Sequence, residues 1–304
     1  MISINVHNEI AQLKAVLLGI ADDFGGTPSL EACYDPKSKE HIIAGTYPVE
    51  KDLIKEIEGL CAVLEKHGVK VFRPENIKGL NQIFTRDIAF VIEGKLVLPN
   101  IIADRKQEAE AITNVLNQIN AEDIIRMPEN TRVEGGDVML CNEYIFVGYS
   151  EKEDFAKYKV SRTNKAGIEF LTTIFPEKIV KGFELNKSDV DAQENALHLD
   201  CCFQPLGKGM AILYKEGFKN QEDVDFLTNY FGVENIIEIT KQEMYNMYSN
   251  VFSIAENIIV SEKGFTRLNA KLKKRGFVVE EIPYAETAKM EGLLRCSTMP
   301  LIRE

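Results

Sequence analysis

The clearest pattern along the chain is a pair of short apolar runs separated by a few polar residues. It occurs four times, at residues 88–100, 137–148, 201–214 and 250–261. Each run has the length of a strand, and the separators Glu-Gly, Asn-Glu, Gly-Lys-Gly and Glu-Asn suit short hairpin turns. We therefore predict four antiparallel β-hairpins.

A helical pattern and a further short strand follow each predicted hairpin. Apolar residues recur at helical spacing in 105–119, 163–174, 222–231 and 265–275. A fifth unit is predicted at the N-terminal end. The strand KAVLLGI leads through an irregular segment to a helix over 49–67, and the strand VKVFRP follows. Gly68 is expected to end this helix.

Five similar units predict one mixed α/β domain over residues 1–304, built as a pseudo-symmetric ring of strand-strand-helix-strand units. A doubly wound parallel sheet would instead alternate single strands with helices. The starts of equivalent strands in such a ring meet near its axis. We therefore expect chemistry directly before each hairpin, where polar residues replace the apolar pattern.

Charge and composition exclude several classes of protein. The 47 acidic residues outnumber the 36 basic ones and give a net charge of −11, which argues against nucleic-acid binding. The apolar runs are far shorter than the roughly 20 residues that span a bilayer, and the start of the chain lacks signal-peptide features. The six cysteines show no CxxC spacing. We expect a cytoplasmic protein with reduced thiols and no membrane association.

Ionisable residues precede the predicted hairpins and lie near the end of the chain. FTRD precedes the first hairpin, VEGGD opens the second, HLD precedes the third, and RCS follows the last unit. The set comprises one cysteine, one histidine and three carboxylates: Cys296, His198, Asp87, Glu134 and Asp200.

Several chemistries are compatible with this set. No HxH or HxxxH spacing supports a metal site, and a Cys-His-acid group for acyl transfer stays open. Three acids around one cysteine would, however, oppose a thiolate and an anionic transition state. A planar guanidinium fits better, because each carboxylate can accept paired N–H bonds from it. Cys201, Cys202 and Cys141 begin or lie in strands and are expected to be core thiols.

The motifs NQIFTRD, VEGGDV, SRTN, HLD and RCSTMPL occur together in this order. In this combination the chain resembles the guanidino-group-modifying enzymes of the pentein superfamily. These include arginine deiminases, dimethylarginine dimethylaminohydrolases and glycine amidinotransferases. The resemblance implies a five-bladed α/β propeller, which agrees with the repeats, and it implies no cofactor and no metal. A small guanidino compound is the implied partner, and a homo-oligomer stays open.

The resemblance also implies roles for individual residues. Cys296 would attack the guanidinium carbon, His198 would transfer protons, and Glu134 would hold the guanidinium and orient the site. The residues implied to bind substrate are Asp87, Asp200, Asn81, Arg105 and Arg162. Arg295, beside the cysteine, is expected either to bind substrate or to cap the rim of the pocket. Asn81 and the first two arginines are matched to groups that hold the amino-acid end of the substrate.

The resemblance defines the reaction less closely than it defines the site. Asp200 favours an unsubstituted guanidinium, because a methylated nitrogen would clash with a carboxylate there. RCSTMPLIR is similar to the deiminase ending and favours a hydrolase, whereas residues 45–74 are similar to amidinotransferases. Glu291 stands where deiminases have an arginine. Residues 27–48 form a long irregular stretch, for which we predict a lid over the substrate. An amidinotransferase, a methylarginine hydrolase and a non-enzymatic binding protein remain alternatives.

Overall fold

Five three-stranded sheets make up the β-structure of the computed structural model, which describes residues 1–304. Within each sheet two strands pair antiparallel and a third runs parallel to the central one. Four sheets are built from continuous stretches of chain that begin with a hairpin. These hairpins are β3–β4 (Phe90–Ile92 and Lys95–Leu98), β6–β7 (Val138–Cys141 and Tyr144–Tyr149), β9–β10 (Phe203–Leu206 and Met210–Leu213) and β12–β13 (Phe252–Ala255 and Ile258–Glu262). All four predicted hairpins are confirmed.

The third strand of each of these sheets returns parallel to the second strand of the hairpin. These strands are β5 (Ile124–Arg126), β8 (Ile179–Glu184), β11 (Ile236–Glu238) and β14 (Val278–Ile282). The helices α6 (Lys165–Ile174), α7 (Gln221–Phe231) and α9 (Thr266–Lys274) connect three of the hairpins to these strands. Each lies where the sequence pattern predicts it.

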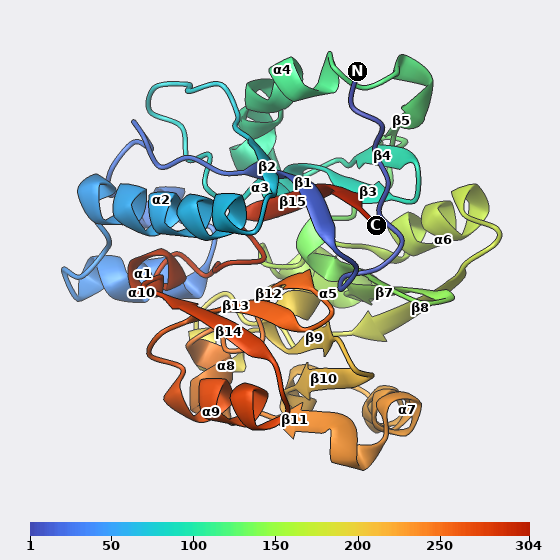
Figure 1. Ribbon diagram of the computed structural model, residues 1–304. Coiled ribbons are helices and arrows are strands. Elements are labelled where there is room, and N and C mark those ends of the chain that lie inside the picture. The colour runs from blue at the N-terminus through green and yellow to red at the C-terminus, as the bar shows by residue number, and fades with distance from the viewer.

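The fifth sheet joins the two ends of the chain. Its central strand β1 (Leu13–Leu18) pairs parallel with β2 (Lys70–Phe72) and antiparallel with β15 (Thr298–Arg303). The strand β15 was not predicted. It supplies the strand that the N-terminal unit lacks, and Figure 1 shows it in red beside the blue β1. Cys296 therefore directly precedes a strand equivalent to the first strand of each hairpin.

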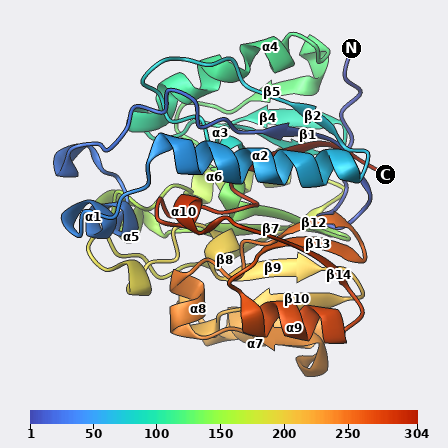
Figure 2. The same cartoon turned by 60° about the vertical axis from the view of Figure 1, so that its left-hand side comes forward.

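The sheets contact one another in the order expected of a ring. β15 contacts β3, β6 contacts β9, and β12 of the last hairpin contacts β1 of the joined sheet. The helix α2 (Glu50–Lys66) confirms the prediction over 49–67, and Gly68 follows its end with a φ of +73°. In Figure 2, α2 and α9 run along the outside of the molecule. No helix combines the length and apolar character required to span a bilayer.

The prediction of a helix over 105–119 is wrong. A 3-10 helix, η2 (Ala103–Ile112), and a short α4 (Thr113–Leu116) occupy this stretch. In a 3-10 helix, side chains three residues apart lie one above the other. Arg105 donates two hydrogen bonds to Glu108, and both side chains are buried. This buried pair lies within the 3-10 helix.

The segment 27–48 is more regular than the sequence indicates. It contains η1 (Leu30–Ala32) and the helix α1 (Pro36–Ile43). Asp35 caps α1 by accepting a hydrogen bond of 2.7 Å from the backbone N–H of Ser38, and proline occupies the first turn. The remaining short helices are α3 (Thr85–Ile88), α5 (Lys152–Lys157), α8 (Lys241–Tyr245) and α10 (Ala285–Ala288).

Candidate active site

The segments directly before the first strand of each sheet assemble the candidate site. Asp87 lies on α3 before β3, Glu134 precedes the 3-10 turn η4 (Gly135–Asp137), and Asp200 lies on η6 (Leu199–Cys201) before β9. Asn250 precedes β12 and Cys296 precedes β15. All five sheets thus contribute at equivalent positions, as the ring predicts.

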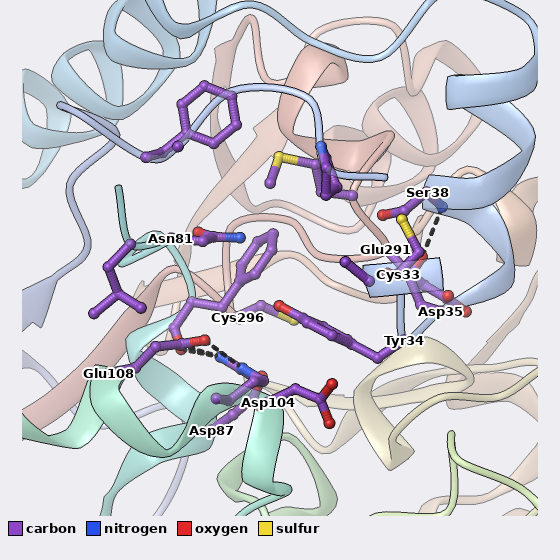
Figure 3. Close-up of a pocket in the computed structure, with 18 of the residues that line it drawn as sticks. Cys33, Tyr34, Asp35, Ser38, Asn81, Asp87, Asp104, Glu108, Glu291 and Cys296 are labelled. Atoms are coloured by element: carbon purple, nitrogen blue, oxygen red, sulfur yellow. Dashed lines mark hydrogen bonds and ion pairs between the residues drawn. The ribbon is translucent and has the colours of Figure 1, made fainter. Parts of the chain in front are cut away.

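A cavity of about 300 Å³ opens beside these segments and is lined in part by segment 27–48. Five of the predicted site residues line it, namely Asn81, Asp87, Arg105, Arg162 and Cys296. Figure 3 shows Cys296 close to the side chain of Tyr34, which comes from segment 27–48. His198, Glu134 and Asp200 are buried and contact the lining residues.

The sulfur of Cys296 lies between a donor and an acceptor. Its Sγ is 3.5 Å from Oδ2 of Asp200 and 3.2 Å from Nδ2 of Asn250. Burial and the carboxylates of Asp200 and Asp87 raise the pKa of the Cys296 thiol well above its usual value. In the free protein at neutral pH the side chain is therefore a thiol, as the acidic surroundings led us to expect.

Asn250 was missed in the sequence. Its Oδ1 accepts hydrogen bonds from the backbone N–H groups of Arg295 at 3.0 Å and Cys296 at 3.2 Å. The same amide therefore holds both the backbone and the sulfur of the cysteine. Asn250 could have been found only by its position. It precedes the fourth hairpin, just as the recognised motifs precede the other hairpins.

His198 is held by two of the predicted carboxylates. Its Nε2 lies 3.0 Å from Oε2 of Glu134, and its Nδ1 lies 3.7 Å from Oδ1 of Asp87. Burial alone would lower the pKa of His198, but the carboxylates of Asp87, Asp137 and Glu134 raise it above its usual value. The imidazole is therefore well placed to carry a proton at neutral pH.

Glu134 is fully buried, and only one of its two carboxylate oxygens has a hydrogen-bond partner. Its Oε2 accepts from His198 and, at 3.2 Å, from Nη1 of Arg162, whereas its Oε1 has no hydrogen-bond partner. Burial opposes ionisation, but the charge of Arg162 and the bond from His198 hold the pKa of Glu134 below its usual value. A buried carboxylate oxygen without a partner is costly unless a ligand completes it.

The two glycines of VEGGD let these segments approach one another. A Cβ on Gly135 would lie 2.0 Å from the carbonyl oxygen of Arg86. A Cβ on Gly136 would lie 2.6 Å from Nδ1 of His198 and 2.9 Å from Oδ1 of Asp87. The backbone N–H of Gly136 donates to that same Asp87 oxygen at 3.2 Å. Gly135 therefore allows the close approach to Arg86, and Gly136 allows the close approach to His198 and Asp87.

Arg105 and Arg162 line the cavity with their guanidinium groups already engaged. Arg105 donates to Asp87 at 2.7 Å, to both oxygens of Glu108, and to the carbonyl of Phe84. Arg162 donates to Glu134 and to the carbonyls of Lys159 and Tyr34. Every guanidinium nitrogen thus has an acceptor within the protein. Their prediction as binders of a substrate carboxylate receives no support from this arrangement.

Arg295, which was expected either to bind substrate or to cap the rim of the pocket, does not line the cavity. Its guanidinium is fully buried between Asp200 at 3.0 Å and Glu9 at 3.1 Å, and it also donates to the carbonyl of Val138 at 2.6 Å. These contacts use the N–H donors of its guanidinium group. Arg295 instead fixes the carboxylate of Asp200, whose Oδ2 also contacts Cys296.

Asp87, Glu134 and His198 also offer ligand atoms within 4.8 Å of one another, which is a spacing suited to a metal ion. Arg105 and Arg162 already donate to Asp87 and Glu134, however, and their positive charges oppose a divalent cation at this point. The arrangement is better matched to a flat organic cation that approaches from the cavity.

The comparisons with known proteins agree with this geometry. The family model described as "N,N dimethylarginine dimethylhydrolase, eukaryotic" matches residues 45–303. The chain belongs to this family. It is thereby a member of the pentein superfamily of guanidino-modifying enzymes, as its motifs indicated.

Individual relatives give the same result. The uncharacterized protein YkgA of Bacillus subtilis is 32% identical over 245 residues, which are 80% of this chain and 78% of YkgA. The arginine deiminase of Streptococcus gordonii is 25% identical over an alignment of 264 positions, which covers 74% of this chain and only 61% of the deiminase. Among solved structures, the N-terminal domain of the cyanobacterial arginine dihydrolase ArgZ has a TM-score of 0.78 at 18% identity. It covers 95% of this chain and 97% of its own and shows the shared pentein fold.

Proposed function

We propose that this protein hydrolyses a C–N bond of a small guanidino compound through a covalent adduct on Cys296. The observation that carries the proposal is a buried thiol in contact with Asp200 at the wall of a cavity. Behind the lining residue Arg162, Glu134 has a carboxylate oxygen without a partner. Asp87 supplies a further carboxylate to the cavity wall. A guanidinium presents its N–H groups in one plane, so several carboxylates can accept from it at once.

Substrate binding prepares the nucleophile. The guanidinium offsets the negative charge of Asp87 and Asp200, which together with burial keeps Cys296 protonated. With that charge offset, the pKa of the thiol falls, and its proton passes to water in the cavity. The thiolate forms next to the carbon that it attacks.

Attack by sulfur forms a C–S bond and converts the guanidinium carbon into a tetrahedral centre. His198 donates its proton to a terminal amino nitrogen, the C–N bond breaks, and ammonia leaves. A thiouronium adduct remains on Cys296. Neutral His198 then accepts a proton from water as the water adds to the same carbon. The C–S bond breaks, and a ureido product and the free thiol result.

A second candidate is the hydrolysis of N-methylated arginines, which the family match over residues 45–303 favours. Asp200 argues for the unsubstituted guanidinium instead. Its carboxylate is fixed by Arg295 and contacts the sulfur, so a methyl group facing it would replace an N–H donor by an apolar group. The proposal therefore favours a free terminal amino group on the substrate.

The test is product analysis by mass spectrometry. The protein is incubated with arginine, agmatine, guanidinoacetate and methylarginines, each with and without glycine or ornithine. Ammonia with a ureido product supports the proposal, whereas methylamine or dimethylamine supports the second candidate. Transfer of the amidino group to the added amine would make the protein an amidinotransferase. No turnover by the wild type, with unchanged ligand binding by Cys296→Ser, would exclude an enzyme of this kind.

A further inference from the structure

A second pair of acids lies in the same cavity and has no part in the proposed chemistry. Asp35, at the start of α1, and Glu291, before the nucleophile, both line the cavity, and both are 5% exposed. Burial and the neighbouring Asp35 raise the pKa of Glu291 well above its usual value, so the two carboxyl groups interact directly. Figure 3 shows both on one side of Cys296, with Asn81 and Glu108 on the other.

A purely structural role explains Asp35 but not Glu291. Asp35 caps α1 through the N–H of Ser38. Glu291 accepts from Nδ2 of Asn195 at 2.7 Å through its Oε1, but its Oε2 is buried without a hydrogen-bond donor from the protein. Its backbone also has a φ of +57°, which a residue with a side chain adopts at a cost. Glu291 and Asp35 share a proton in the free protein, and this strained, buried pair is a position where a cationic ligand can replace that proton.

The cations near the cavity do not complete this pair. Arg105 and Arg162 use every guanidinium nitrogen on other acceptors. Lys37 follows Asp35 in the chain, and its buried ammonium offsets part of the charge of Asp35 and Glu291, but it donates to the carbonyl of Tyr245 and forms no hydrogen bond with either carboxyl.

The charge of the cavity lining also favours an ammonium group over a carboxylate on the substrate. Two arginines are the only basic residues in the lining. Five acidic residues line the cavity, namely Asp35, Asp87, Asp104, Glu108 and Glu291. A carboxylate on the substrate would meet this negative surface, and the charges of Arg105 and Arg162 are already paired with buried carboxylates. An ammonium group would meet complementary charge and can replace the proton that Asp35 and Glu291 share.

We propose that Asp35 and Glu291 bind a primary ammonium group at the end of the substrate remote from its guanidinium. The substrate is then an alkylguanidine that carries an amine and no carboxylate at its far end. This inference rests on the proposed function, since it names the substrate class of the same site. In this complex the ammonium N–H groups donate to Oε2 of Glu291 and to the carboxylate of Asp35.

The test compares three substrates that share the guanidinium. Agmatine carries the terminal amine, arginine carries the amine and a carboxylate, and butylguanidine carries neither. We expect kcat/KM to be at least about tenfold higher for agmatine than for the other two, which is the range of one charge-assisted hydrogen bond. The difference should appear mainly in KM, because the amine does not take part in the bond changes.

Variants of Asp35 and Glu291 test whether these two residues cause the preference for agmatine. Glu291→Gln keeps the shape of the side chain, and Asp35→Asn keeps the cap on α1. Each should lower kcat/KM for agmatine about tenfold or more and leave that for butylguanidine unchanged. Asp104→Asn is the matched control, because it removes one negative charge from the same lining, where Asp104 pairs with the surface residue Lys159. It should leave the preference intact.

Two outcomes would overturn the inference, and they are distinguishable. Turnover of arginine or butylguanidine at least equal to that of agmatine, or a preference unchanged in both Glu291→Gln and Asp35→Asn, overturns the amine-binding pair and leaves the proposed function standing. Absence of turnover for every guanidino compound by the wild-type protein overturns both.

Discussion

Around the sulfur of Cys296, two neighbours have opposite effects on the thiolate. The amide of Asn250 donates toward the sulfur, while the carboxylate of Asp200 raises the pKa of the thiol. Nucleophilicity therefore depends on whether a cation compensates Asp200. The same carboxylate is held in place by Arg295, so the residue next to Cys296 contributes to the site indirectly.

Replacement of Asn250 by aspartate isolates its effect on the sulfur. Asn250→Asp keeps the oxygen that accepts the two backbone N–H groups but places a negative charge about 3.2 Å from the sulfur. We expect alkylation of Cys296 by iodoacetamide at pH 8 to slow at least about tenfold, because the added charge raises the pKa of the thiol. Asn142→Asp in the β6–β7 turn is the control. An unchanged alkylation rate in Asn250→Asp would contradict the assigned contact.

At the scale of elements, the site depends on short turns that precede strands and pack tightly. The turn η4 reaches both α3 and His198 because Gly135 and Gly136 lack side chains. Small displacements of catalytic groups lower rates steeply. The spacing between these turns is therefore as important as the side chains that they carry.

Gly136→Ala tests this spacing. Its Cβ would lie 2.6 Å from Nδ1 of His198, so the imidazole must move. We expect kcat to fall about 100-fold or more while the protein still folds. Gly59→Ala on α2, where a Cβ meets nothing within 4 Å, is the control. It should keep its activity and raise the free energy of unfolding by about 0.5–1 kcal/mol. Equal activity of the two variants would contradict the role of Gly136.

Elements whose signals are local were predictable from the sequence, and elements set by distant partners were not. The hairpins and α2 follow from periodicity and turn residues. The strand β15, for example, depends on pairing with β1 at the other end of the chain. The motifs identified Cys296, His198 and the three acids. Asn250 lies in no recognised motif, and no motif indicates that the guanidinium of Arg295 forms an ion pair with Glu9.

At the scale of the whole molecule, a buried charge network joins the segment before β1 to the start of β9. Arg295 bridges Glu9 and Asp200, and all three side chains are buried. Burial would raise the pKa of Glu9, but Arg295 and Arg86 lower it to about 2. The folded protein therefore prefers the ionised form of Glu9, and loss of one partner leaves an uncompensated buried charge.

This network predicts a pH dependence of stability. A lowered pKa stabilises the fold above the unfolded-state value of about 4.5, and the stabilisation is lost as pH falls toward 2. Glu9→Gln should lower the free energy of unfolding by about 3–5 kcal/mol at pH 7 and show a smaller further loss between pH 5 and pH 3. Urea unfolding at these pH values measures both, with the exposed Glu177→Gln as control. Equal pH slopes in wild type and Glu9→Gln would contradict the network.

The central claim is that Cys296 attacks the guanidinium carbon, and intact-mass spectrometry tests it most directly. Acid quench of the wild-type protein during turnover should trap the adduct, because protonated His198 cannot accept the proton of the water that releases it. After incubation with agmatine or arginine and an acid quench, we predict a mass increase equal to the substrate cation minus ammonia and the thiol proton, located on Cys296 by peptide mapping and absent in Cys296→Ser. An increase equal to the amidino group alone would indicate the other C–N bond and a transferase. An adduct that persists in Cys296→Ser, or steady wild-type turnover by that variant, would contradict the account.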